Sequence, residues 1–440
     1  MRHYIPYKAI FVPPFGQVDV TDVLLVIDHP LFQKLRHRTH LGFVSHVYPC
    51  ATHTRFSHSL AVYEVCKKIT SHLLERNMLT QEQAKNTNMA ALLHDLGHGP
   101  FSHLIEPLMA KSNTRFSNHK IRTRELLDDP SLRQAIEQAR CEPSWVQKIA
   151  AKEDPLGQII SNNTIGADKM AYTAQDQYFT GYPGRPVDYG AVIPFLMYLE
   201  EIYGGEEKNW RLLVAMQSFF FDMYTGVYFR KQVKARERLF EKSLEIAFHE
   251  GTLIPDTVWD MTEQELFVQL TKSSNSKIKT ILGRMDYSSP HSYKNAITVK
   301  LEEYSTTVRV GSKPTNTLAL DPEALKQVLG LCQDPLQRTK IEHMLATGLG
   351  IPEDDLILTT YPEFGNIIPQ DVTLFDSQGR KCGSLFGFYP KHQQALQEKA
   401  KDYLCIMVMV SEQHRVQVAR MSQKIASLLS TLVSAQYSTA

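Results

Sequence analysis

The sequence contains few cysteines and no closely spaced pair of them. The six cysteines stand at positions 50, 66, 141, 332, 382 and 405. The CxxC spacing that is typical of zinc ribbons and redox motifs is therefore absent. We expect no disulfide framework, because scattered thiols of this kind are typical of a protein from a reducing compartment.

The sequence also lacks long apolar runs and an excess of one charge. A membrane-spanning helix needs about 18 consecutive apolar residues, and no stretch of the sequence is that long. The N-terminal residues also lack the apolar core of a secretory signal. Lys and Arg total 48, and Asp and Glu total 47. Without a basic excess, nucleic acid is not indicated as a partner. These absences predict a cytoplasmic protein with no membrane partner.

The chain is long, and its histidines are unevenly distributed. Its 440 residues suffice for two or three domains with a large core. Twelve of the 17 histidines precede residue 120. Because histidine is the side chain best suited to proton transfer near neutral pH, this asymmetry indicates that the chemistry lies in the N-terminal third.

Helical periodicity dominates the first 250 residues. Leucine, isoleucine and valine recur with a helical period between residues 54 and 76, which predicts a helix there. We expect further helices over 81–96, 168–179 and 218–249, and a series of short helices, broken by prolines, over 101–162. The runs 198–202 and 211–216, split by Gly204 and Gly205, predict a β-hairpin.

From residue 252 onward, strand-like runs alternate with helices. Thr262 and Glu265 have the spacing of a capping box, which predicts a helix that ends near Thr271. Strands are expected over 296–302, 355–361, 372–375 and 403–410, and helices near 322–330, 336–346, 391–400 and 412–434. The sequence therefore predicts a mainly α fold, with a helical core over 1–251 and a smaller α+β region over 252–440.

One segment concentrates candidate metal ligands. His94 and Asp95 stand side by side at the expected end of a helix, just before Gly97, and His98 and His103 follow. An imidazole and a carboxylate form a donor set that suits Fe, Mn, Co, Ni or Zn, and Mg less well. A lone His-Asp pair is usually an ordinary polar pair, so the surrounding histidines carry the metal hypothesis.

Several segments in order resemble the HD-domain phosphohydrolases, and within them the deoxynucleoside triphosphate triphosphohydrolases of the dGTPase and SAMHD1 type. The similar segments lie within about residues 5–250, and they are Phe32–Arg36, His53–Leu60, His94–His103, His119, Asp168–Lys169, Tyr172 and Asp176. The resemblance implies an HD-domain helical core, a divalent metal ion and a nucleotide substrate.

The resemblance also implies a ligand set for the metal ion. The matching positions come from three helices, and they are His58, His94, Asp95 and Asp168. An ion held there (Mn, Fe, Mg, Ni, Co or Zn) can polarise a phosphoryl group and lower the pKa of a bound water. Taken alone, His58 is more simply a hydrogen-bonded histidine of a helical domain.

A second set of residues matches the proton-transfer groups of the family. By resemblance, His103 lies beside the scissile bond as general acid or nucleophile, and Glu106 orients a neighbouring histidine. His98 and His119 complete this catalytic set. The family usually has glutamate after the position of His119, whereas this chain has Lys120, which weakens the placement of His119.

A third set matches substrate contacts. By resemblance, Arg55, Lys169 and Tyr172 contact phosphates or sugar, and Asp176 contacts a sugar hydroxyl. Bland alternatives are a solvated arginine or lysine, a core tyrosine and a surface carboxylate. Two positions depart from the family. His40 replaces a glutamine near the sugar, and Val227 replaces an arginine, so that Arg230 or Lys231 supplies that charge or the γ-phosphate is held less firmly.

The resulting hypothesis is metal-dependent hydrolysis of a deoxynucleoside triphosphate, dGTP-like, to deoxynucleoside and inorganic triphosphate. One alternative is an HD phosphohydrolase that acts on another nucleotide, which the changes at His40 and Val227 keep open. Another is a nucleotide-sensing protein with little turnover that signals through residues 252–440. By resemblance we expect a homo-oligomer, dimer or tetramer, and allow for a nucleotide activator. The C-terminal region is a candidate for an assembly or regulatory role.

Overall fold

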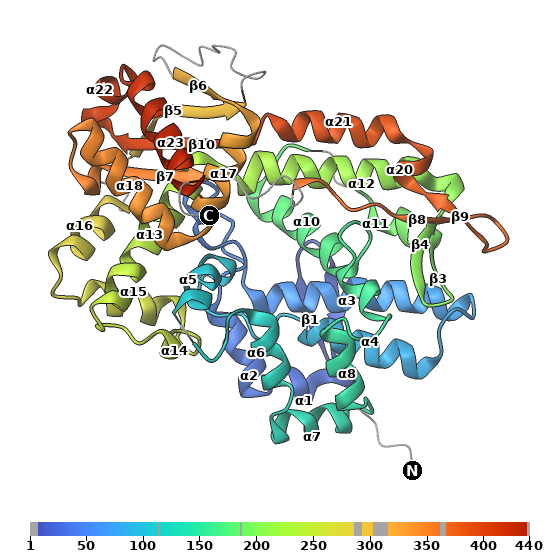
Figure 1. The fold of residues 1–440 in the computed structure, drawn as a ribbon. Coiled ribbons are helices and arrows are strands. Elements are labelled where there is room, and N and C mark those ends of the chain that lie inside the picture. Colours follow the sequence, from blue (N-terminus) through green and yellow to red (C-terminus); the bar gives the residue numbers. More distant parts are fainter. Residues whose placement is uncertain are drawn as a thin grey trace.

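Helices predominate in the computed structural model, which describes residues 8–112, 114–184, 187–285, 293–301, 316–360 and 367–437. Within these ranges the strands form one two-stranded and two four-stranded sheets (Figure 1). The prediction of a mainly α fold is confirmed. None of the described helices combines the length and apolar character that crossing a bilayer requires.

The N-terminal part begins with a β-hairpin, and most of the elements that follow are helices. The hairpin pairs β1 (Ala9–Val12) with β2 (Gly16–Asp19). The helices are α1 (Leu24–Ile27), α2 (Pro30–Gln33), α3 (Arg55–Glu75), α4 (Gln81–Leu93), α5 (Glu106–Lys111), α6 (His119–Leu126), α7 (Pro130–Gln138), α8 (Pro143–Ala150), α9 (Gly157–Ser161), α10 (Ala167–Thr180), α11 (Tyr189–Val192), α12 (Trp210–Met223) and α13 (Lys231–His249). The short helices predicted over 101–162 are present, and three of them carry proline in their first turn.

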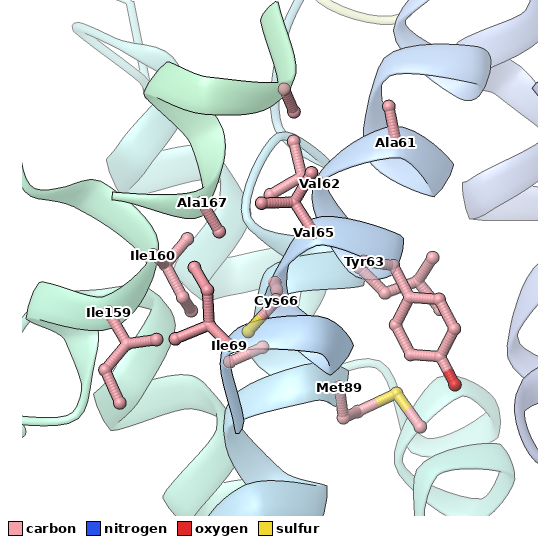
Figure 2. Packing of buried hydrophobic residues seen from close by; sticks show 14 of the residues in the cluster. Ala61, Val62, Tyr63, Val65, Cys66, Ile69, Met89, Ile159, Ile160 and Ala167 are labelled. Atoms are coloured by element: carbon pink, nitrogen blue, oxygen red, sulfur yellow. The ribbon is translucent and has the colours of Figure 1, made fainter. Parts of the chain in front are cut away.

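Helix α3 is the centre of the N-terminal part. Thr54 caps its first turn by accepting a hydrogen bond from the Ser57 backbone N–H. The helix packs against α4 and α10, and Figure 2 shows its Val62, Val65 and Ile69 among side chains of α4, α9 and α10. Burial on nearly all sides fixes the helix in place, so a polar side chain in its first turn is held rigidly.

Two sequence predictions in the middle of the chain are wrong. Residues 211–216 belong to α12, and the hairpin is formed instead by β3 (Leu196–Leu199) and β4 (Ile202–Glu206). The helix expected over 218–249 is two helices, because a π-helical turn at Tyr224–Tyr228 separates α12 from α13. A continuous apolar run does not by itself distinguish a strand from a buried helix.

The β3–β4 hairpin is extended by strands from the C-terminal part. β8 (Thr373–Phe375) pairs in parallel with β4, and β9 (Lys381–Ser384) pairs with β8. A Cβ atom at Gly204 would lie 2.4 Å from the Thr373 carbonyl oxygen, so glycine is required for this pairing. Val372, Leu374 and Leu385 belong to the same apolar cluster as α3.

The C-terminal sheet has the strand order β6 (Asn316–Leu320), β5 (Tyr293–Leu301), β10 (Cys405–Ser411) and β7 (Leu356–Thr360). Every residue of β10 is buried. Ile406, Val408 and Val410 face one apolar cluster, and Met407 and Met409 face another that includes residues of α13. This alternation places the sheet between two layers of helices.

The C-terminal part contains further helices, and only some of them pack against that sheet. They are α14 (Pro255–Val258), α15 (Glu263–Thr271), α16 (Ser276–Met285), α17 (Pro322–Gln333), α18 (Pro335–Leu349), α20 (Leu385–Phe388), α21 (Pro390–Lys401), α22 (Arg415–Ala419) and α23 (Ser422–Tyr437). The capping box of Thr262 and Glu265 and the end of α15 at Thr271 are confirmed. Residues 302 and 361 of the predicted strands lie outside the described residues.

Candidate metal centre and active-site cavity

Three predicted metal ligands meet between α3, α4 and α10. His58 comes from the first turn of α3, His94 is the C-terminal cap of α4, and Asp168 lies in the first turn of α10. Oδ1 of Asp168 lies 3.1 Å from Nε2 of His58 and 3.6 Å from Nε2 of His94. The three donor atoms are close enough together to share one metal ion. We call these three residues the ligand cluster.

The orientation of His94 fits a metal-binding role. Its Nδ1 lies 2.8 Å from the carbonyl oxygen of Ala91, which leaves Nε2 directed at the cluster. Nε2 is buried and has no hydrogen-bond partner in the described structure. A histidine ligand typically has this arrangement, because the bond on one ring nitrogen fixes the tautomer that offers the other to the metal.

Asp95, the fourth predicted ligand, lies at the edge of the cluster. Its Oδ1 is 3.2 Å from Nε2 of both His94 and His98, and its Oδ2 is 2.5 Å from Nη1 of Arg55. Burial opposes ionisation, but His94 and Arg55 hold the pKa of Asp95 well below its usual range. Asp95 therefore remains a carboxylate that binds an arginine and can also bind a metal.

The charges of the cluster reinforce one another. Although burial disfavours its charged form, the neighbouring Asp95 and Asp168 carboxylates raise the pKa of His94 to about 9. Burial likewise opposes ionisation of Asp168, but the neighbouring His58 and His94 imidazoles lower its pKa. Two ionised carboxylates beside two imidazoles form a site for a divalent cation, which would replace the proton on His94.

The predicted proton-transfer residues form a second cluster around Glu106. Oε1 of Glu106 lies 2.7 Å from Nδ1 of His119, and Oε2 lies 3.4 Å from Nδ1 of His103. The ring of His98 stacks on that of His119 with 3.8 Å between centroids. We call these four residues the histidine relay. His103 is its exposed member, with 67% of its side chain accessible, so it can reach a substrate in solution.

Gly97 makes the histidine relay possible. A Cβ atom there would lie 2.2 Å from the His119 carbonyl oxygen and 2.3 Å from the Thr123 backbone nitrogen. The start of α6 therefore packs directly against the backbone of the motif, and His119 comes to lie over His98. Despite Lys120, His119 lies next to Glu106 and His98.

Asp176 lies at the centre of a third group. It is on the same side of α10 as Asp168, and its Oδ1 is 2.9 Å from Nε2 of His53 and 3.8 Å from Nε2 of His40. The hydroxyl of Tyr228 donates to its Oδ2 at 2.5 Å. The ring of His40 also packs on that of His58, 4.1 Å away, which joins this group to the ligand cluster.

His53 and Tyr228 were not among the predicted site residues. His53 is part of the segment that resembles the family, so its position there was a usable signal. Tyr228 lies in the π-helical turn between α12 and α13, which the prediction of one continuous helix concealed. This turn directs the tyrosine toward Asp176.

Lys169 and Tyr172 lie beside the ligand cluster in an aromatic environment. The Lys169 ammonium donates a hydrogen bond to the Tyr172 hydroxyl and lies 3.4 Å above the centre of the Phe220 ring. Burial lowers the pKa of Lys169 to about 7, against the opposing effect of Asp168. Such a partly desolvated cation interacts strongly with an incoming anion.

Two of the predicted phosphate contacts differ in position. Arg55 is buried, and its Nε donates to Oγ of Ser102 at 3.0 Å while Nη1 binds Asp95. Arg230 is exposed, and its Nε donates to the Gly226 carbonyl at 2.6 Å and to the Tyr48 hydroxyl at 3.0 Å. No contact between Arg230 and the ligand cluster is recorded among the described residues, and Val227 is buried.

A cavity of about 410 Å³ opens beside these groups. Arg55, His40, His103 and Tyr228 line one part of it, and residues of α13, α17, α18 and β7 line another. Its volume lies in the range of ligand-binding sites. The cavity therefore gives a ligand access to the histidine relay and to the groups around Asp176.

Residues 55–162 match the family model for the HD domain. This range contains the candidate ligands His58, His94 and Asp95 and all four residues of the histidine relay. Together with the helical fold and the ligand cluster, the match defines an HD-domain protein. Residues 55–162 of the chain therefore form an HD domain.

Proteins similar to part of this chain include some that are named for triphosphohydrolase activity. The chain is 30% identical over 237 residues to "Deoxynucleoside triphosphate triphosphohydrolase SAMHD1" of Gallus gallus, which covers 46% of this chain and 38% of that protein. An uncharacterized protein of Mycoplasma genitalium is 33% identical, and the match covers 38% of this chain and 41% of that protein. An uncharacterized protein of Methanocaldococcus jannaschii is 28% identical, and the match covers 62% of this chain and 56% of that protein. The chain thus spans about half the length of these relatives or less.

Solved structures resemble the whole chain. A hypothetical protein from Aquifex aeolicus has a TM-score of 0.68 at 21% identity, covering 96% of this chain and all of that one. A phosphohydrolase from Bacteroides thetaiotaomicron has a TM-score of 0.66 at 17% identity, covering 92% and 99%. The architecture, including the C-terminal region, is therefore shared.

Proposed function

We propose that the protein hydrolyses deoxynucleoside triphosphates, dGTP-like, to deoxynucleoside and inorganic triphosphate with the help of a divalent metal ion. The observation that carries this proposal is the ligand cluster of His58, His94 and Asp168, which lies next to the histidine relay and a cavity of nucleotide size. The similarity to relatives named as deoxynucleoside triphosphate triphosphohydrolases supports the choice of substrate.

The metal ion would be held by the ligand cluster, with Asp95 as a fourth ligand. When bound, an ion of this kind polarises a phosphoryl group and lowers the pKa of a water molecule. Two imidazoles and two carboxylates suit Mn, Fe, Co, Ni or Zn, and Mg less well. The buried Nε2 of His94, which has no hydrogen-bond partner in the described structure, supports this assignment.

The protein's own residues would supply phosphate binding and proton transfer. Arg55 and the Lys169 ammonium provide positive charge for the triphosphate, and the Tyr172 hydroxyl beside Lys169 provides a further polar contact. In the reaction the oxygen of water bonds to the α-phosphorus and the bond from phosphorus to the 5′-oxygen breaks. His103 would give a proton to that oxygen, and Glu106, 3.4 Å from its Nδ1, would hold the imidazole in position.

Asp176 would bind a sugar hydroxyl. Its carboxylate already accepts hydrogen bonds from His53 and Tyr228, which hold it at the side of the ligand cluster. His40 stands near the same carboxylate and would replace the glutamine of the family. Because a histidine here changes the sugar contact, a different nucleotide is the second candidate substrate. Arg230 is proposed to reach the γ-phosphate only if its contacts with Tyr48 and Gly226 rearrange.

Product analysis tests the proposal. Purified protein is incubated with each of the four deoxynucleoside triphosphates, singly and mixed, with Mn²⁺, Mg²⁺ or Fe²⁺, and the products are separated by anion exchange. We expect free deoxynucleoside and inorganic triphosphate in equal amounts. Release of pyrophosphate or orthophosphate, or intact substrates under every metal, would reject it.

A variant pair tests the ligand cluster. Asp168→Asn should reduce bound metal to less than a tenth of the wild-type content and abolish product formation, since an amide replaces a charged ligand. Asp222→Asn, at an exposed position on α12, should retain both. Metal content is measured by mass spectrometry, so this test is independent of substrate choice. Wild-type metal content in Asp168→Asn would remove this residue from the ligand set.

We also propose a homo-oligomer, dimer or tetramer, with residues 252–440 in an assembly or regulatory role and with a nucleotide activator. The family resemblance supports these expectations. Sedimentation velocity with and without mixed nucleotides tests them. A monomer under both conditions would reject the assembly, and equal rates for single and mixed substrates would reject the activator.

A further inference from the structure

The cavity beside the histidine relay is lined partly by the C-terminal region. Helix α13 contributes Lys234, Glu237, Arg238 and Glu241, which follow one face of the helix. Gln333 at the end of α17, Arg338 of α18 and the end of β7 complete this side. Figure 1 shows α18 and β7 next to α13. Two regions far apart in sequence thus line one cavity.

The arginines on this side are already engaged by protein groups. Arg238 donates to Glu241, Glu245 and Glu342 at 2.6 to 2.8 Å. Arg338 donates to Glu241 at 3.1 Å and to the Cys332 carbonyl at 2.7 Å. These paired groups form a rigid wall, because breaking a buried ion pair is costly.

Three other side chains on this wall retain hydrogen-bonding capacity. The Nε2 atom of Gln333 is buried and has no partner among the residues that the structure describes. Lys234 binds one oxygen of Glu237, at 2.7 Å, which leaves two N–H donors and a carboxylate oxygen for other contacts. A buried amide donor without a partner is uncommon and indicates a missing acceptor.

We propose that Gln333, Lys234 and Glu237 bind the nucleobase of the substrate, so that α13 and the C-terminal region together determine base preference. This inference rests on the proposed nucleotide substrate. The Gln333 amide and the Lys234 ammonium donate, and Glu237 accepts. A base that presents a carbonyl oxygen next to N–H donors, as guanine does, matches this set. Adenine presents an amino group where the carbonyl would be, and it leaves a donor without an acceptor.

Binding of non-hydrolysable analogues tests the inference separately from turnover. The analogues of the four deoxynucleoside triphosphates, and inorganic tripolyphosphate, are titrated into the full-length protein by calorimetry. For the wild type we expect the guanine analogue to bind tightest. Gln333→Leu should weaken that analogue about tenfold and leave tripolyphosphate unchanged, because one hydrogen bond to the base is lost. Gln394→Leu, at an exposed position on α21, is the matched control.

A second variant keeps the test informative if Gln333→Leu folds poorly. Gln333→Glu has nearly the same shape but replaces the donor by a carboxylate, so it should reduce the preference for guanine over adenine further than Gln333→Leu does. Equal weakening of all four analogues, or an unchanged ratio between bases, would overturn the inference.

The outcome is also distinguishable from failure of the proposed function. If the wild type forms no triphosphate but its base-dependent binding is lost in the Gln333 variants, the proposed reaction fails and the base-binding assignment holds. If triphosphate forms and the variants keep the wild-type ratio between bases, the reaction holds and the assignment fails. Wild-type binding of all four analogues with equal affinity also rejects the assignment.

Discussion

Glu106 contacts both a mostly buried histidine, His119, and an exposed one, His103. Its Oε1 lies 2.7 Å from Nδ1 of the mostly buried His119, and its Oε2 lies 3.4 Å from Nδ1 of the exposed His103. Burial by itself would raise the pKa of Glu106, but the hydrogen bonds from both histidines lower it below its usual range. One carboxylate therefore links the buried and the accessible ends of the histidine relay.

Replacing this carboxylate should impair catalysis more than substrate binding. We expect Glu106→Gln to lower kcat about 100-fold, because proton transfer by an oriented group contributes about that much, and to change KM little. The control is Glu82→Gln, at an exposed position in the first turn of α4. Steady-state kinetics over pH 5.5 to 9 give the measurement. A wild-type kcat in Glu106→Gln would exclude Glu106 as a positioning residue.

Gly97 should tolerate no side chain. We expect Gly97→Ala to destabilise the protein by about 1–3 kcal/mol, because the added Cβ overlaps the backbone of α6. Gly283→Ala is the control. It lies within α16 with no atom near the added Cβ, so it should be neutral or stabilising by up to about 1 kcal/mol. Urea unfolding measures both, and equal effects of the two variants would contradict the packing argument.

Phosphate binding should weaken as pH rises through neutrality. Burial lowers the pKa of Lys169 to about 7, so its ammonium form is present below that pH and is lost above it. We expect the affinity for tripolyphosphate to fall between pH 6 and pH 8 by up to about tenfold more than in Lys169→Met. Titration calorimetry on both proteins gives the difference. Lys85→Met, an exposed control, should follow the wild type.

Acid should destabilise the junction between α13 and α18. Burial opposes ionisation of Glu342, but Arg238 and Lys242 lower its pKa to about 2 from an ordinary 4.5. Between about pH 2 and pH 4.5, Glu342 therefore binds a proton more readily in the unfolded chain than in the folded protein. The stabilisation from this group is fully present above pH 4.5 and is lost as pH falls toward 2, and it amounts to on the order of 3 kcal/mol.

Comparison with a neutral variant isolates this effect. In Glu342→Gln the free energy of unfolding should be lower at pH 7 and should fall less between pH 5 and pH 3 than in the wild type. Glu323→Gln, at an exposed position on α17, should show the wild-type slope. Parallel curves for Glu342→Gln and the wild type would show that Glu342 carries no such dependence.

Much of the site was predictable because its ligands belong to local patterns. The periodic apolar residues after Thr54 place His58 in the first turn of a buried helix, and the run before Gly97 places His94 and Asp95 at the end of the next. Asp168, Tyr172 and Asp176 follow one helical face by spacing alone. The structure brings His58, His94 and Asp168 together as the pattern and the resemblance implied.

Other contacts depend on tertiary packing. Tyr228 binds Asp176 across 52 residues, and only the π-helical turn that splits the predicted long helix directs it there. The apolar run 211–216 is compatible with either a strand or a buried helix, so the surrounding structure decided that it forms part of α12. The pairing of β4 with β8 joins segments about 170 residues apart, which no local period encodes.

The sequence by itself determined most helices of the N-terminal part, the residue types of the candidate metal site and the order in which they occur. These depend on short-range periodicity and on the chemistry of single side chains. Only the tertiary structure decided which distant groups meet. In the folded protein Arg55 binds Asp95, and His53 and Tyr228 both contact Asp176. Gln333 of the C-terminal region lies in the cavity wall. The physical reason is that such contacts follow from the packing of whole helices and sheets, which depends on all their buried faces together.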